Sequence, residues 1–168
     1  MTDTSTDNAA AKGPDLLVQE GDIAGDYLER LLDIADVDGD IDIDVENERA
    51  VVAIVGDGLD ALVGANGVVL EAVQELTRLT VLRETGARSR LMLDIGGWRA
   101  DRKTALVEIA GRAARRCLDS GEPVRLAPMT PFERKIVHDA IADIAGVGSE
   151  SEGVEPERRV VVLPDPGQ

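Results

Sequence analysis

The chain is poor in cysteine, histidine and aromatic residues. Cys117 is its one cysteine and His138 its one histidine, which excludes an internal disulfide bond and a Cys/His zinc set. Aromatic residues make up 2% of the 168 residues, so Val, Leu, Ile and Ala must build the core and few side chains can stack on nucleobases. No apolar run approaches the roughly 20 residues of a membrane-spanning helix, and the polar, acidic start is unlike a secretory leader. We therefore expect a cytoplasmic protein without membrane insertion.

The charge is strongly acidic and unevenly distributed. The 33 acidic and 18 basic residues give a net charge of −15. Residues 1–48 hold 15 acidic and two basic residues, whereas residues 97–138 hold nine basic and five acidic ones. A basic segment in an acidic chain is typical of a nucleic-acid-binding surface, although a solvated helix face produces the same pattern.

The first half of the chain shows both helical and strand-like patterns. Residues 1–22 are polar and acidic without an apolar period, which predicts a disordered acidic tail. The alternation Asp-Ile-Asp-Ile-Asp-Val-Glu predicts a strand with an acidic solvent face, and the apolar run after it predicts a strand buried on both faces. The expected elements are a helix from Ile23, a hairpin of strands at 40–46 and 50–55, a helical turn at 59–63, a helix carrying Val69 to Val81, and a strand at 90–95.

The second half alternates helix and strand. Thr130, Pro131 and Glu133 form a capping box, the clearest helix start in the chain. The apolar face expected for this helix is Phe132, Ile136, Val137, Ala140, Ile141 and Ile144. The expected elements are a helix at 99–118, a short strand at 124–126, the capped helix, a Gly/Ser/Glu/Pro-rich turn after Gly146, and a strand at 158–163. Together the two halves predict an α+β fold in two small modules.

A glycine-flanked loop, Gly64-Ala65-Asn66-Gly67, precedes the helix that carries Val69 to Val81. Without Cβ atoms at Gly64 and Gly67, a sugar-phosphate backbone can approach closely, and the start of the next helix offers N–H groups to a phosphate. The pattern is weak alone, since any helix–turn–helix can use two glycines.

Arg134 and His138 are four residues apart on the capped helix, so they share a face and could grip one phosphate. The alternative is a solvated arginine beside a surface histidine. No Ser or Cys nucleophile accompanies His138, so we expect neither catalysis nor a cofactor. Gly56-x-Gly58-x-x-Ala61 has the form of a dinucleotide-binding turn, but glycines break the helix after it, which leaves a nucleotide-binding enzyme as a distant alternative.

Taken in order, four sequence blocks resemble the Jag family, SpoIIIJ-associated bacterial proteins that join a KH domain to an R-three-H domain. The blocks are Leu62–Gly67 with Leu70–Gln74, Asp94–Lys103, Pro128–His138, and Ser151–Arg158. The resemblance covers about residues 23–163. It implies a KH domain of the type II strand order at residues 23–97 and a small α/β R-three-H domain at residues 98–164.

The resemblance also implies a function. Members of the family look like non-enzymatic RNA-binding proteins or RNA chaperones in post-transcriptional control tied to cell elongation and envelope growth, and they often work with a small stand-alone KH protein. The expected ligand is single-stranded RNA, with single-stranded DNA as the second candidate. The implied RNA contacts are Gly64, Ala65, Asn66 and Gly67 on the backbone, Arg134 and His138 on the single-strand-binding face, and Arg99, Arg102, Lys103 and Arg158 as auxiliary phosphate contacts.

An adaptor is the alternative function. Family loops usually carry Lys or Arg between the glycines, whereas this one has Ala65 and Asn66. With the acidic strand at 40–46 and the acidic tail, this difference favours a first module that binds a protein partner, with nucleic acid bound only by the second module. A further hypothesis is that the tail folds back on the basic segment and weakens non-specific binding.

Overall fold

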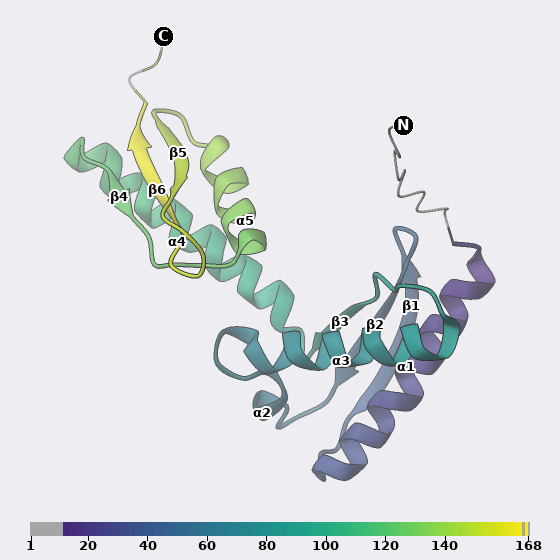
Figure 1. Ribbon diagram of the computed structural model, residues 1–168. Coiled ribbons are helices and arrows are strands. Elements are labelled where there is room, and N and C mark those ends of the chain that lie inside the picture. Colours follow the sequence, from purple (N-terminus) through teal and green to yellow (C-terminus); the bar gives the residue numbers. More distant parts are fainter. Residues whose placement is uncertain (1–11, 166, 168) are drawn as a thin grey trace, which may run out of the picture. The chain divides into compact units, whose positions relative to one another are not determined.

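The structure is a computed structural model that describes residues 12–165 and 167. The chain forms two compact units, Met1–Trp98 and Arg99–Gln168, each with its own three-stranded sheet and hydrophobic core (Figure 1). Among the described residues, no helix is both long enough and apolar enough to cross a bilayer. Helices and strands occur in both units, which confirms the predicted α+β class.

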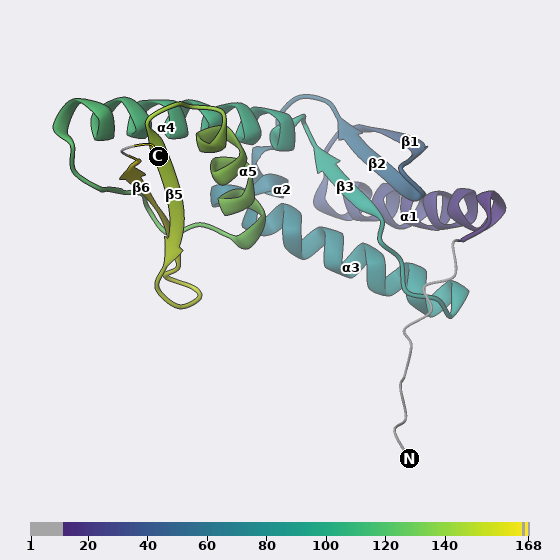
Figure 2. The same cartoon turned by 90° about the horizontal axis from the view of Figure 1, so that it is seen from above.

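The first unit places two long helices on one face of its sheet (Figure 2). Its elements are α1 (Pro14–Ala35), β1 (Asp40–Glu46), β2 (Arg49–Val55), α2 (Asp60–Val63), the 3-10 turn η1 (Ala65–Gly67), α3 (Val68–Thr85) and β3 (Met92–Ile95). The sheet order is β1-β2-β3, with β1 antiparallel and β3 parallel to β2. The order helix, strand, strand, helix, helix, strand is the one that the resemblance implied for the first module.

The sheet of the first unit is covered on one face only. Ala50, Val52 and Ile54 of β2 are fully buried against α1 and α3, whereas Val55 is 47% exposed. The prediction that β2 is buried on both faces is therefore wrong, because no helix in the described part of the first unit covers the second face. The antiparallel register places Asp42 beside Ala53 and Asp44 beside Val51, so this open face is acidic, as the alternation in β1 predicted.

Helix α1 begins at Pro14, nine residues before the predicted start at Ile23. The prediction of a disordered tail is wrong for residues 14–22, and residues 1–11 lie outside the described part of the chain. The side chain of Glu20 is buried, accepts a hydrogen bond from Ser89 Oγ at 2.8 Å and pairs with Lys12. These contacts tie the start of α1 to the segment before β3.

The apolar pattern of the sequence did not predict the first turns of α1, because the positions of this helix that face the sheet are not all apolar. Gly21 and Gly25 face Ile43 of β1, and a Cβ at either glycine would approach that side chain to 2.6 or 2.8 Å. Small residues at these positions let the helix lie close to the strand. Their lack of side chains removes the apolar signal on which a helix prediction depends.

The second unit packs two helices against a second sheet. Its elements are α4 (Trp98–Ser120), β4 (Val124–Arg125), α5 (Pro131–Ala142), β5 (Val147–Glu152) and β6 (Arg159–Pro164). The sheet order is β4-β6-β5, and all pairs are antiparallel. The core residues include Leu106, Ala110, Cys117, Val137, Ile141, Val160 and Val162. The predicted capping box is confirmed, since Thr130 Oγ1 accepts from Glu133 N at 3.3 Å and Glu133 Oε2 accepts from Thr130 N at 3.0 Å.

Strand β5 was not expected from the sequence. Its residues Val-Gly-Ser-Glu-Ser-Glu were assigned to a turn because they include one apolar side chain. As an edge strand, β5 needs little apolar surface, and its pairing with β6 supplies its backbone hydrogen bonds.

Candidate nucleic-acid interface

The Gly64–Gly67 loop is shaped by contacts within the first unit. A Cβ at Gly67 would lie 2.5 Å from Trp98 Cη2, and one at Gly64 would lie 2.5 Å from Val69 Cγ2. Both glycines also have a left-handed backbone, with φ of 73° at Gly64 and 75° at Gly67. The unit's own packing therefore requires both glycines. The side chains that the loop exposes are those of Ala65 and Asn66, neither of which is charged.

Arg134 lies near the start of α5 and is 8% exposed. Its Nη1 donates to the carbonyl oxygen of Met129 at 2.7 Å, and its Nη2 pairs with Glu155 Oε1 at 2.6 Å. Glu155 belongs to the loop between β5 and β6. Arg134, which the sequence predicted to contact a phosphate, thus already pairs with the carboxylate of Glu155, and this pair holds the loop near α5.

His138 is held between two serines of β5. Its Nδ1 is 2.7 Å from Ser149 Oγ and its Nε2 is 2.8 Å from Ser151 Oγ. A neutral imidazole donates from one nitrogen and accepts at the other, and each hydroxyl can supply the complementary role. His138 therefore ties α5 to β5 with both nitrogens. Arg134 and His138 share a face of α5, as predicted, but that face contacts β5 and the loop between β5 and β6.

Three of the four auxiliary arginines and lysines also have contacts within the chain. Arg102 Nε donates to Glu133 Oε1 at 2.7 Å and so joins α4 to the capping box of α5. Arg158 Nη1 donates to the carbonyl oxygen of Gly153 at 2.7 Å. Arg99 is half-buried and interacts with other described residues. Lys103 is exposed and makes no ion pair within the described part of the chain.

The two units differ sharply in charge. Residues 1–98 hold 21 acidic and seven basic residues, a net charge of −14, whereas residues 99–168 hold 12 acidic and 11 basic residues, a net charge of −1. On α4, the side chains of Lys103, Arg115 and Arg116 are exposed and have no carboxylate partner among residues 12–165. Within the second unit, these three cations are the ones most available to a polyanion.

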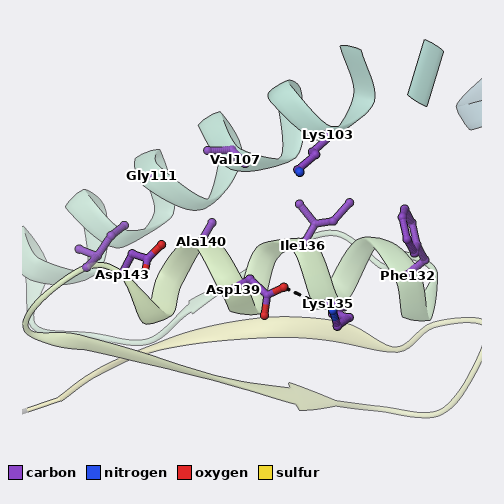
Figure 3. A pocket seen from close by; sticks show the side chains of 10 residues that line it. Lys103, Val107, Gly111, Phe132, Lys135, Ile136, Asp139, Ala140 and Asp143 are labelled. Carbon is purple, nitrogen blue, oxygen red and sulfur yellow. Dashed lines mark ion pairs between the residues drawn. The ribbon is translucent and has the colours of Figure 1, made fainter. Parts of the chain in front are cut away.

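A groove of about 630 Å³ lies between α4 and α5 (Figure 3). Its lining comprises Lys103, Val107, Gly111, Phe132, Lys135, Ile136, Asp139, Ala140, Asp143 and Ile144. Phe132 stands at one end and is 62% exposed. Its assignment to a buried apolar face is wrong, because the side of α5 that meets the core carries Val137 and Ile141.

The sequence therefore did not identify several residues of this region. Ser149 and Ser151 were missed because their strand was taken for a turn, and Glu155 because its partner Arg134 lies 21 residues earlier. The capping box does signal that Phe132 occupies the first turn of α5, where a side chain can lie beyond the core.

Replacing Gly67 by Ala tests the packing of the loop against Trp98. Gly58→Ala is the matched control, because Gly58 has φ of 70° but open space around its Cβ position. We expect Gly58→Ala to lower the free energy of unfolding by about 1–2 kcal/mol through backbone strain, and Gly67→Ala to cost about 1–3 kcal/mol more through overpacking. Urea unfolding followed by the fluorescence of Trp98 measures both. Equal losses would contradict the contact.

A double-mutant cycle tests the link between His138 and β5. We expect His138→Ala to lower the free energy of unfolding by about 1–2 kcal/mol, because two hydrogen bonds are lost. His138→Ala and Ser149→Ala should be coupled by about 0.5–1.5 kcal/mol in urea unfolding. Ser120→Ala is the control, since Ser120 Oγ accepts only a local hydrogen bond from Glu122 N at 3.1 Å and should be additive with His138→Ala. Additivity of His138 and Ser149 would refute the link.

Comparison with known proteins places this geometry in context. The family model of the R-three-H domain matches residues 104–164, which lie in the second unit. Three relatives are each named RNA-binding protein KhpB. The one from Clostridium symbiosum is 32% identical over 143 residues, 84% of this chain and 64% of the relative. The one from Lactiplantibacillus plantarum is 31% identical over 137 residues, 82% of this chain and 42% of the relative.

The relative from Bacillus subtilis is 30% identical over 128 residues, 74% of this chain and 62% of the relative. The chain thus spans between 42% and 64% of the length of these relatives. The chain is a homologue of these proteins and contains an R-three-H domain, which confirms the resemblance to the Jag family.

Proposed function

We propose that the chain binds single-stranded RNA through its second unit, without catalysis, and acts in cytoplasmic post-transcriptional control. The observation that carries this proposal is the R-three-H match at residues 104–164, supported by relatives named as RNA-binding proteins. The proposal extends to the link with cell elongation and envelope growth that the resemblance implied. Single-stranded DNA of the same sequence is the second ligand to compare.

The charge distribution supports assigning the RNA to the second unit. That unit holds 11 of the 18 basic residues, whereas the first unit carries a net charge of −14. Phosphate contacts supply most of the affinity in non-specific nucleic-acid binding, and a strongly acidic surface opposes them. The Gly64–Gly67 loop, in the proposed KH domain, exposes Ala65 and Asn66 but no cation. Its contribution is then limited to hydrogen bonds and a close backbone approach.

Arg134 and His138 act in this proposal as positioning residues. Their contacts with Glu155, Ser149 and Ser151 hold β5 and the loop after it against α5. The exposed cations of α4 contact the phosphates. Arg134 itself reaches a phosphate only where that phosphate displaces the half-exposed carboxylate of Glu155.

Fluorescence anisotropy of labelled single-stranded RNA at two salt concentrations tests this assignment. We expect Arg115→Ala/Arg116→Ala to weaken binding and to lower the dependence of log K on log salt by about 1–1.5, because two phosphate contacts are lost. Arg30→Ala/Arg83→Ala removes two exposed cations from the first unit and should leave both quantities unchanged. No binding by the wild-type chain at low salt would overturn the proposal.

The same assay tests whether the loop meets the RNA. Ala65→Asp and Ala65→Lys place opposite charges on one exposed position without changing either glycine. Similar affinities for the two variants support an RNA site confined to the second unit. A clear preference for Ala65→Lys would instead place the loop on the path of the RNA.

A second candidate function, an adaptor that binds a small KH-domain protein, is favoured by the surface of α3. Val68 is 64% exposed, Leu76 50% and Leu79 57%, and their spacing of eight and three residues places them on one stripe of the helix. An apolar stripe of this kind suits packing against a helix of another protein. It lies on the acidic unit, so it does not compete for the cations of the second unit.

The adaptor function predicts that Leu76→Glu/Leu79→Glu abolishes the complex with a purified small KH-domain protein from the same organism. The cause would be two carboxylates buried in an apolar contact. Val18→Glu, at an α1 position that is 53% exposed, is the control and should leave the complex intact. Sedimentation velocity measures the complex. An undiminished complex with the double variant would remove α3 as its interface.

A further inference from the structure

Phe132 is the aromatic side chain that neither core uses. Tyr27 and Trp98 pack against the core of the first unit, whereas Phe132 is 62% exposed on the second. A single exposed apolar side chain is common and needs no special explanation. What distinguishes Phe132 is its surroundings at the end of the α4/α5 groove.

Two lysines accompany Phe132 at this end of the groove. Lys103 projects from α4 toward Ile136, whereas Lys135 lies next to Asp139 on the other side of α5 in the view of Figure 3. Lys103 has no ion pair within residues 12–165. Lys135 is 76% exposed and pairs with Asp139 across 3.7 Å, where Asp139 is 71% exposed. Such a solvent-exposed ion pair contributes little to stability. A phosphate can therefore replace the Asp139 carboxylate as the partner of Lys135 at a small cost in free energy.

The charge changes along the groove. Asp143 lies toward the end away from Phe132 (Figure 3). The first-turn N–H group of Glu133 is already bonded to Thr130, and Glu133 itself closes the capping box. Attraction for an anion near Phe132 therefore comes from the two lysines, and a phosphate chain is repelled from the opposite end.

We propose that Phe132 is a stacking platform for one base of the bound single-stranded RNA, with Lys103 and Lys135 contacting the phosphates on either side. The inference rests on the proposed RNA-binding function and adds to it a site for a nucleobase. An exposed aromatic ring flanked by cations is the combination by which proteins hold single strands without reading their sequence. The carboxylate of Asp143 disfavours a phosphate at the other end of the groove, so we expect the strand to cross the groove rather than to run along it.

Phe132 lies on a different side of α5 from His138, because six residues at about 100° each separate them by about 120°. His138 contacts β5 and Arg134 contacts the loop after it, whereas Phe132 and Ile136 line the groove. Variants of Phe132 therefore leave the contacts of His138 and Arg134 in place. This separation allows stacking to be tested without loosening β5.

The test compares two labelled oligonucleotides of equal length and charge, one of single-stranded RNA and one whose sugars carry no bases, on the full chain. We expect Phe132→Leu to lower the affinity for RNA about tenfold, because stacking on one base is lost, and to bind the abasic chain as the wild type does. Phe132→Trp keeps an aromatic face and should bind RNA like the wild type. Leu118→Ala, at another half-exposed apolar position of the second unit, is the control and should change neither affinity.

Lys103→Ala separates phosphate contact from stacking. It should weaken binding to both oligonucleotides by the same factor, since both carry the same phosphates. As a direct readout, the extra indole of Phe132→Trp should lose fluorescence on binding RNA but not on binding the abasic chain, with wild-type Trp98 emission as the background.

Two outcomes would overturn the inference. Phe132→Leu could bind RNA as tightly as the wild type, or it could lose RNA and the abasic chain equally, which would indicate a structural role for the ring. In each of these cases the wild type still binds RNA and the proposed function stands. A wild-type chain that binds neither oligonucleotide at low salt overturns both.

Discussion

The orientation of α5 is the constraint on which the second unit depends, and two hydrogen bonds between His138 and β5 fix it together with the burial of Val137 and Ile141. With Ser149 and Ser151 on its two ring nitrogens, His138 faces the sheet, and Arg134, one turn earlier, faces the loop that carries Glu155. Because a helix turns about 100° per residue, Phe132 and Ile136 then point away from His138 and line the groove. The groove between α4 and α5 is a consequence of this orientation of α5.

A second consequence concerns the polar residues around α5. Glu133 closes the capping box and also accepts from Arg102 of α4, so one carboxylate fixes both the start of α5 and its distance from α4. Buried or half-buried charges of this kind are expensive unless paired. Here Arg102, Glu133, Arg134 and Glu155 all have partners. Charges that are committed to the fold in this way are poor candidates for releasing counterions from RNA.

Much of the fold followed from local sequence rules. The capping box at Thr130, the hairpin of β1 and β2 and the order of elements in the first unit are all present. These predictions succeeded because each depends on residues close in sequence. The early start of α1 and the strand β5 were missed, since glycines and serines carry no apolar period and gain their structure from Ile43 and from pairing with β6.

The same distinction explains the candidate site. The motif residues Gly64, Gly67, Arg134 and His138 were recognisable by type and spacing, but their partners Val69, Trp98, Glu155 and the β5 serines belong to tertiary structure. No spacing rule could show that the hydrogen-bonding capacity of His138 is already used within the fold.

The motif residues Arg134 and His138 are therefore a poor guide to ligand contacts, because their hydrogen-bonding groups are used within the fold. Residues that hold a helix to a strand, such as His138, use their hydrogen bonds within the fold. The proposed ligand contacts require exposure, which Lys103, Arg115, Arg116 and Phe132 have in the second unit. An exposed lysine can move to a neighbouring position without harm to the fold. The proposed RNA-binding surface is thus located by the cations that the structure leaves exposed and without a carboxylate partner, and the motif residues hold β5 and the loop after it to α5.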